Sequence, residues 1–330
     1  MKISKVVFLV VVLAMLVAMV GCGPTAAPTA PPKKVYTYKD MTVGFIQTGS
    51  EGGWRTANTG SFKETAEQQG INLKFYDAQN KLENQVSAFH QFNQDKDVNV
   101  IILAALETTG WDDVLKEAKA NGKIVVLEDR RIDAAEDLYA TYIGSDFAEE
   151  GRKSAVEVCK LLEGMKGKNV WELVGNVGSS AAKDRGQGFR EKMDSCGIKI
   201  TKSQTANWSI TEGKQVTEAW LKETKDVQAI FAQNDEMGLG AAQALKEAGL
   251  KPGVDVKILT VDATAGAFKA MIAGEVNVVV ECNPLLAPQV YEAALKALNG
   301  ESLPKWVPSQ EGVFRSTDPN LQDIANSRKY

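Results

Sequence analysis

The sequence is poor in histidine: His90 is the single one among 330 residues. A zinc site with two or three imidazole ligands is therefore excluded, and Ser-His-Asp or Cys-His catalysis has to pass through His90. Histidine pH switches are disfavoured for the same reason. Cysteine is also scarce, with four residues and no Cys-x-x-Cys pair, and there is no Asp-rich calcium loop. We therefore predict no metal site and no cofactor.

An excess of positive charge is missing as well. The chain has 38 Lys and Arg against 42 Asp and Glu, a net charge of −4, and no basic tract. A protein that binds a phosphate backbone needs such a tract, so nucleic acid is excluded as the main partner. A chain of this length forms roughly two domains and has enough core to fold without disulfides.

The sequence has one long apolar run, Val6–Val20, which follows Lys2 and Lys5 and precedes Gly21-Cys22. At about 15 residues it is shorter than the ~20 that a spanning helix needs. The pattern is typical of a secretory signal, and it resembles a bacterial lipoprotein signal in which Cys22 would be lipidated. An uncleaved membrane anchor is the alternative. We expect a signal peptide over residues 1–21 and a tether rich in Pro and Ala over residues 22–38.

From Thr42 onward, short β-branched runs alternate with longer amphipathic stretches, which is typical of a parallel sheet with crossover helices. We predict ten strands, at residues 43–47, 72–76, 100–104, 124–127, 139–143, 169–174, 199–203, 229–232, 257–261 and 276–280. Helices are expected between them, at residues 54–69, 82–94, 111–121, 149–163, 183–194, 210–223, 237–248 and 286–298.

Ten strands are too many for one ordinary sheet, and they divide into two groups of five near Gly144-Ser145-Asp146. The segments 283–284 and 305–308 contain proline and are candidates for further crossings, which would complete a three-stranded hinge. We expect an N-terminal lobe of residues 39–144 plus about 283–311, and a C-terminal lobe of residues 145–282 plus about 312–330.

Polar side chains follow the apolar runs, where parallel sheets bind ligands. They are Gln47, Asp77, Glu107, Asp129, Arg130, Asn176, Asn234, Asp235, Asp262 and Glu281. Paired acceptors and forked donors of this kind match the vicinal hydroxyls of a polyol. Asp77 and Asp235 are interpreted as helix caps, whereas Asp129 and Arg130 together cap poorly and clamp hydroxyls well.

Two loops rich in small residues lead into helices. The first, residues 47–55, lacks the Gly-Lys-Ser/Thr end of a phosphate loop, and Glu51 would repel a phosphate. Trp54 instead offers an aromatic face and Arg55 a donor fork, which favours a sugar; interlobe packing of Trp54 and a solvated Arg55 are the alternative. In the second loop, residues 178–186, Arg185 sits in a first helical turn, which suggests an anionic or polyol partner.

The three remaining cysteines have two expected roles. An exported protein meets an oxidising milieu, so Cys159 and Cys196 are candidates for a disulfide, with free buried thiols as the equal alternative. Cys282 is predicted to be unpaired and buried.

Seven motifs of this chain carry a family resemblance: VGFIQTGSEGGWR (43–55), TGW (109–111), Asp129-Arg130, VGSSAAKDR (177–185), NDEM (234–237), KEAGLKPG (246–253) and Val261-Asp262. With them the chain resembles the sugar-binding proteins of ABC importers in the ribose/galactose-binding superfamily, most of all the galactofuranose-binding proteins. The similarity runs from about Met41 to about Pro288. The sequence differs from the family pattern at Gly52, where the family has Ser, and at Cys282-Asn283.

The resemblance implies an α/β fold, the type I periplasmic binding protein fold. It has two Rossmann-like lobes, a three-stranded hinge and a ligand in the interlobe cleft. It further implies that the sugar contacts are Glu51, Trp54, Arg55, Asp129, Arg130, Arg185, Asn234 and Asp262. The implied protein is a monomeric, lipid-anchored extracytoplasmic receptor that carries a monosaccharide to an ABC permease by lobe closure and touches the membrane only through its anchor.

Two other functions fit parts of the pattern. A sensor that presents sugar occupancy to a chemoreceptor or a histidine-kinase ectodomain would use the same pocket, and nothing in the chain separates the two. A glycosidase would need Glu51 with Asp129 or Asp262 as its carboxylate pair. Three arginines around the pocket disfavour the raised pKa of a catalytic acid, so we predict that the protein is not an enzyme.

Overall fold

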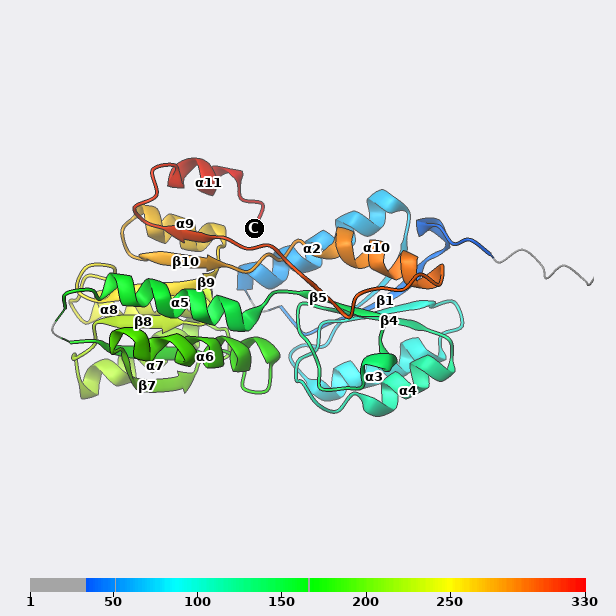
Figure 1. Cartoon of the computed structure of the whole chain (residues 1–330), viewed down its shortest axis with the longest axis horizontal. Coiled ribbons are helices and arrows are strands. Elements are labelled where there is room, and N and C mark those ends of the chain that lie inside the picture. Colours follow the sequence, from blue (N-terminus) through cyan, green and yellow to red (C-terminus); the bar gives the residue numbers. More distant parts are fainter. Residues whose placement is uncertain (1–33, 51, 166) are drawn as a thin grey trace, which may run out of the picture. The chain divides into compact units, whose positions relative to one another are not determined.

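The computed structural model describes residues 34–50, 52–165 and 167–330 (Figure 1). The predicted signal peptide, Cys22, most of the tether and Glu51 lie outside these residues. Residues Tyr36–Tyr330 form one unit that contains two six-stranded sheets. Within the described residues, no helix combines the length and the apolar character that crossing a membrane requires.

The first sheet is parallel throughout, because every neighbouring pair of its strands runs in the same direction. Its strand order is β11-β5-β4-β3-β1-β2. Strands β3 and β5 are buried along their whole length, as expected for a sheet with helices on both faces. The strands are β1 Thr42–Gln47, β2 Asn72–Asp77, β3 Val100–Leu103, β4 Ile124–Glu128, β5 Thr141–Gly144 and β11 Trp306–Pro308.

Two separate hydrophobic clusters cover the faces of this sheet. On one face α2 (Gly52–Gln69) and α10 (Ala287–Leu298) contribute to a cluster in which the rings of Phe45 and Phe62 are 4.2 Å apart. On the other face α3 (Leu82–Gln94) and α4 (Asp112–Ala120) pack residues such as Trp111. Short 3-10 helices lie at Tyr38–Asp40 and Glu136–Leu138.

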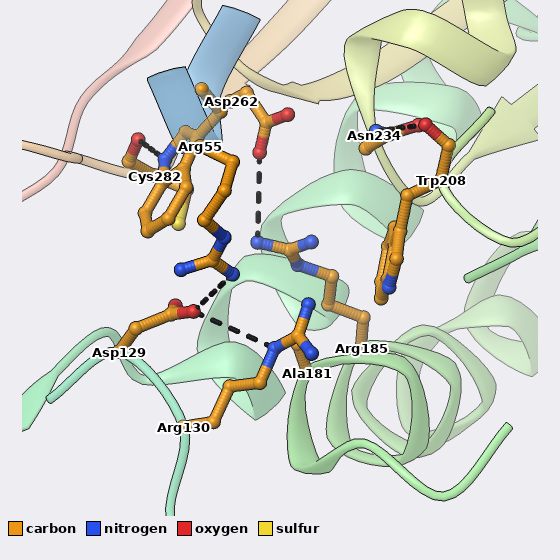
Figure 2. A pocket seen from close by; sticks show the side chains of 10 residues that line it. Arg55, Asp129, Arg130, Ala181, Arg185, Trp208, Asn234, Asp262 and Cys282 are labelled. Carbon is orange, nitrogen blue, oxygen red and sulfur yellow. Dashed lines mark hydrogen bonds and ion pairs between the residues drawn. The ribbon is translucent and has the colours of Figure 1, made fainter. Parts of the chain in front are cut away.

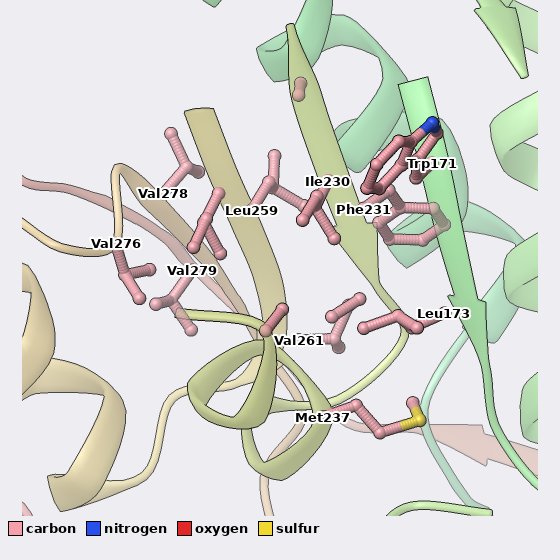
Figure 3. Packing of buried hydrophobic residues seen from close by; sticks show 14 of the residues in the cluster. Trp171, Leu173, Ile230, Phe231, Met237, Leu259, Val261, Val276, Val278 and Val279 are labelled. Carbon is pink, nitrogen blue, oxygen red and sulfur yellow. The ribbon is translucent and has the colours of Figure 1, made fainter. Parts of the chain in front are cut away.

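The second sheet has the order β12-β10-β9-β8-β6-β7, and only β12 runs antiparallel to its neighbour. Its core includes Trp171, Phe231 and Leu259, which project from neighbouring strands (Figure 3). The strands are β6 Asn169–Val174, β7 Lys199–Thr205, β8 Ala229–Ala232, β9 Lys257–Asp262, β10 Val278–Glu281 and β12 Val313–Arg315. The helices are α5 Phe147–Leu161, α6 Ser180–Met193, α7 Ile210–Glu223, α8 Asp235–Glu247, α9 Ala265–Ile272 and α11 Leu321–Ser327, and Asp194–Cys196 is 3-10.

The chain passes between the sheets three times, after β5, after β10 and between β11 and β12. Glu311 joins all three crossings through one carboxylate oxygen. This Oε1 accepts hydrogen bonds from Ser145 Oγ in the first crossing, from Asn283 N in the second (3.1 Å) and from Ser309 Oγ in the third (2.8 Å). The predicted fold class, two Rossmann-like lobes with a three-stranded hinge, is confirmed.

All ten predicted strands and all eight predicted helices occur, with ends displaced by a few residues. The sequence prediction missed α9, α11, β11 and β12. The two strands have only three residues each and lie at sheet edges, and both helices are short, so none of them carries a long periodic signal.

The sulfur atoms of Cys159, in α5, and Cys196, in the 3-10 helix after α6, are bonded at 2.01 Å. Cys282 is a free, buried cysteine.

Candidate functional site

A cavity with about 340 Å³ of empty space lies where the carboxyl ends of strands from both sheets meet (Figure 2). Its lining is dominated by charged and aromatic side chains: Trp54, Arg55, Asp129, Arg130, Ala181, Arg185, Trp208, Asn234, Asp262 and Cys282. Seven of the eight predicted contacts are among them, and the eighth, Glu51, lies outside the described residues.

The first lobe contributes two pairs of neighbours, Trp54-Arg55 at the start of α2 and Asp129-Arg130 after β4. Arg55 Nη2 binds Asp129 Oδ2 over 2.6 Å, and both side chains are buried. Asp129 has a φ of +58°, a conformation that costs free energy for a residue other than glycine. Tyr142 stabilises this backbone by donating from its hydroxyl to the Asp129 carbonyl (2.8 Å). In this backbone conformation the Asp129 carboxylate points toward Arg55 and the cavity.

The second lobe contributes Arg185 from α6. Its Nε donates to Glu150 Oε2 (2.6 Å), its Nη1 to the Gln233 carbonyl (2.8 Å), and its Nη2 lies 3.9 Å from Asp262 Oδ1. Burial by itself would lower the pKa of this guanidinium, but the Glu150 carboxylate, by its charge and its hydrogen bond, raises it above its ordinary value. Arg185 is therefore a permanently charged donor in a fixed orientation.

Asp262 is the last residue of β9 and faces Arg185 across the cavity (Figure 2). Burial raises the pKa of its carboxyl well above the usual range, and the nearby Asp235 adds to the shift. Asp262 and the next residue, Ala263, both have positive φ, +129° and +70°. The backbone at this strand end is thus bent so that the carboxyl turns into the cavity, where it can accept or donate a hydrogen bond.

Asn234 lines the cavity and also caps α8, because its Oδ1 accepts from Met237 N (3.0 Å). The prediction that Asp235 caps this helix is wrong. Asp235 is the first helical residue, and its carboxylate accepts hydrogen bonds from Thr260 and Thr264 instead.

Asp77 is not a helix cap either. The N-cap of α3 is Lys81, and the Asp77 carboxylate accepts from Gln79 N (2.8 Å) and Ser50 Oγ (3.1 Å). The Asp77 carboxylate closes a turn before the helix begins. An Asp at the end of a strand is compatible with such a turn and with a helix cap, so its residue type alone does not distinguish them.

Trp208 lines the cavity but was missed in the sequence. Its ring lies 5.8 Å from the Arg130 guanidinium and 5.6 Å from that of Arg185, within cation–π range. The side chain is 5% exposed, and among the described residues its Nε1 has no hydrogen-bond partner. Gly175 makes room for it, since a Cβ there would lie 2.0 Å from the ring. The sequence did contain a signal for it, because Trp208 lies three residues beyond the end of β7, where cavity residues are expected.

Cys282 places its thiol at the cavity wall, and burial raises the pKa of this thiol well above its usual value. The neutral thiol behaves as a small apolar group. The Cys282 carbonyl accepts from Trp54 Nε1 (2.7 Å), which fixes the indole against the wall.

One group of three possible metal ligands, Glu150, Cys282 and Glu311, occurs in the described part of the chain, with ligand atoms within 4.8 Å of one another. The Glu150 carboxylate already binds Arg185, and Glu311 Oε1 accepts three hydrogen bonds at the hinge. A cation would have to compete with a guanidinium for the same carboxylate, so the donor set fits a hinge contact better than a metal.

A periplasmic binding protein domain matches residues 43–302. The chain is 41% identical over 293 residues to the galactofuranose-binding protein YtfQ of Escherichia coli K12, covering 87% of this chain and 92% of that protein. It is 36% identical over 334 residues to the fructose import binding protein FruE of Bifidobacterium longum, covering 99% of each.

Among solved structures, a Mycobacterium smegmatis protein in complex with β-D-fucofuranose is 43% identical and has a TM-score of 0.85. The match covers 88% of this chain and 95% of that one.

Proposed function

The chain belongs to the periplasmic binding protein family, whose members bind solutes and are not enzymes, and on that premise we propose that it is the sugar receptor of an ABC importer. In this proposal it captures one monosaccharide outside the cytoplasm and delivers it to a membrane permease. The observation that carries the proposal is the composition of the cavity, whose forked donors, paired acceptors and indole rings come from both lobes.

The chemistry of the lining favours an uncharged polyol. Arg55, Arg130 and Arg185 offer donors to hydroxyl and ring oxygens, the Asp129 carboxylate accepts from hydroxyls, and the Asp262 carboxyl can accept or donate. Arg55 is paired with the Asp129 carboxylate and Arg185 with the Glu150 carboxylate, so most of the positive charge of the three guanidiniums is compensated and the site attracts an anion only weakly.

The indoles complete the recognition of a sugar. Trp54 and Trp208 can stack on the C–H faces of the ring, and the buried Nε1 of Trp208 can donate to one more hydroxyl.

The two-lobed lining also supplies a mechanism. A ligand that touches both lobes binds the closed arrangement better than the open one, and it therefore shifts the population toward closure. The permease would then recognise the closed form.

We propose galactofuranose or a related aldose as the sugar. The relatives support this choice, since one is named for galactofuranose and one is solved with a fucofuranose. The name of the fructose import protein widens the range of candidate sugars and favours transport over sensing. The lipid anchor at Cys22 remains part of the proposal, supported by the run of residues that precedes it.

The test is a thermal-shift screen against galactose, arabinose, ribose, xylose, fructose and a source of galactofuranose, followed by calorimetry on the sugars that stabilise the protein. Arg130→Ala and Asp262→Ala should each weaken binding by roughly tenfold or more, because each leaves buried polar partners unsatisfied. Arg152→Ala, a surface variant of the second lobe, is the control and should bind as the unaltered protein does. Retained affinity in both pocket variants would overturn the site assignment.

A further inference from the structure

A pair of charged side chains joins the two lobes outside the cavity. Arg131 follows β4 of the first sheet, and Asp184 lies in α6 over the second sheet. The guanidinium binds the carboxylate with two parallel contacts, Nε to Oδ2 at 3.0 Å and Nη2 to Oδ1 at 2.8 Å. Neither residue lines the cavity.

Arg131 has one further contact in its own lobe and one across the lobes. Its Nη1 binds Asp133 Oδ1 (3.2 Å) in the first lobe, and its backbone N–H donates to Ser180 Oγ (3.2 Å) at the start of α6 in the second lobe. The two-point contact with Asp184 is the strong form of an arginine–carboxylate pair. Its strength is moderated by water, because the Arg131 and Asp184 side chains are 38% and 14% exposed.

The pair is adjacent in sequence to the cavity residues of each lobe. Arg131 directly follows Asp129 and Arg130, and Asp184 directly precedes Arg185. Any movement that brings Arg131 to Asp184 therefore also brings Arg130 and Arg185 toward a common ligand. Two further hydrogen bonds join the lobes. Gly53 N–H donates to Glu236 Oε1 (3.0 Å), and Thr108 N–H donates to the Gly178 carbonyl (3.0 Å).

We propose that Arg131 and Asp184 form an interlobe clamp that stabilises the closed arrangement and so sets sugar affinity without touching the sugar. This inference rests on the proposed function. The apparent dissociation constant equals the intrinsic one divided by the fraction of the sugar-free protein that is in the closed arrangement. Loss of the clamp lowers this fraction and therefore weakens the binding of every sugar by the same factor. A pocket residue, by contrast, changes the ratio between sugars.

A double-mutant cycle tests the clamp. Arg131→Met, Asp184→Asn and the double variant are titrated by calorimetry with two sugars of different affinity for the unaltered protein. We expect each single variant to bind roughly three- to tenfold more weakly, with the ratio between the two sugars unchanged. The double variant should be no weaker than the worse single one, because one interaction is lost in all three. In 1 M salt the difference in sugar affinity between the unaltered protein and the variants should become much smaller, because salt screens the ion pair.

The control is Arg152 with Glu191, an arginine–carboxylate pair (2.9 Å) that is also partly exposed but lies within the second lobe. Arg152→Met and Glu191→Gln should leave affinity within about twofold of the unaltered protein. Circular dichroism and thermal unfolding verify that all variants fold.

Small-angle scattering without sugar separates the clamp from the proposed function. A weaker clamp should increase the radius of gyration of Arg131→Met relative to the unaltered protein. Affinity within twofold together with identical scattering would overturn the clamp, and so would losses that differ between the two sugars. A protein that binds no sugar but whose scattering responds to Arg131→Met would overturn the proposed function and keep the clamp.

Discussion

Arg185 Nε donates a hydrogen bond to Glu150 Oε2 over 2.6 Å, and both side chains are almost fully buried. The contact forms because α5 and α6 approach each other very closely. A Cβ on Gly188 would lie 1.9 Å from the Ala148 carbonyl oxygen, so only glycine permits this approach. A carboxylate of one helix therefore orients the arginine that the neighbouring helix offers to the cavity.

Glu150→Gln should damage both stability and sugar binding. It removes the negative charge that compensates a buried guanidinium, and breaking such a pair costs about 3 kcal/mol or more. We expect that loss in the free energy of unfolding, measured with urea, and a weaker affinity in calorimetry. Glu149→Gln, on the partly exposed side of the same helix turn, removes only a surface pair with Arg152 and should stay within about 1 kcal/mol. Equal stability of the two variants would contradict the role assigned to Glu150.

Gly175→Ala should weaken sugar binding without any direct contact to the sugar. The new Cβ would lie 2.0 Å from the Trp208 ring, which has to move out of the cavity wall. We expect an affinity loss of roughly tenfold, together with a change in tryptophan fluorescence. Gly60→Ala is the control, because that Cβ meets no atom within 4 Å and alanine favours the helix. Unchanged fluorescence and affinity in Gly175→Ala would show that Trp208 does not need this space.

Glu311→Gln should flatten the dependence of stability on pH. Burial, with a contribution from Glu150, raises the pKa of Glu311 to about 8. Between the unfolded pKa, near 4.5, and about 8, the native state then holds a proton that the unfolded state has lost. The stabilisation is complete below the unfolded pKa and is lost as the pH rises to about 8, by at most about 1.4 kcal/mol per pH unit.

The measurement is urea unfolding at pH 5, 6.5 and 8. The variant should lose less stability over this range than the unaltered protein. Burial also raises the pKa of Glu128 to about 8 and that of Asp235 to about 7, so part of the slope should remain. Glu292→Gln, at an exposed helix position, should keep the full slope. A slope in Glu311→Gln equal to that of the unaltered protein would refute the assignment.

Reduction of the Cys159–Cys196 disulfide should destabilise the second lobe and leave the cavity intact. The bond closes a loop with a sequence separation of 37, which corresponds to about 2–4 kcal/mol. We expect that loss in unfolding experiments with a reductant, and again in the double variant Cys159→Ser/Cys196→Ser. Sugar affinity should not change, because neither cysteine lines the cavity. A reductant effect that persists in the double variant would point to another thiol.

Much of the architecture follows from local patterns. The apolar runs of Val100–Leu103 and Ala229–Ala232 predicted buried parallel strands, and the residues after such runs predicted the cavity wall. Asp129 follows β4 of the first sheet and Asp262 ends β9 of the second. Both lie at the cavity because the carboxyl ends of the parallel strands of each sheet share one edge.

The sequence by itself therefore determined the two lobes, the longer strands and helices in their order along the chain, and most of the polar lining of the cavity. Only the tertiary structure decided that Trp208 stands against Gly175, that Glu150 orients Arg185, and that Arg131 meets Asp184. The hinge is the clearest case, since Ser145 and Glu311 are 166 residues apart in the chain. Hydrophobic periodicity reports which face of an element is buried, whereas these contacts depend on which elements pack together and how closely their backbones approach.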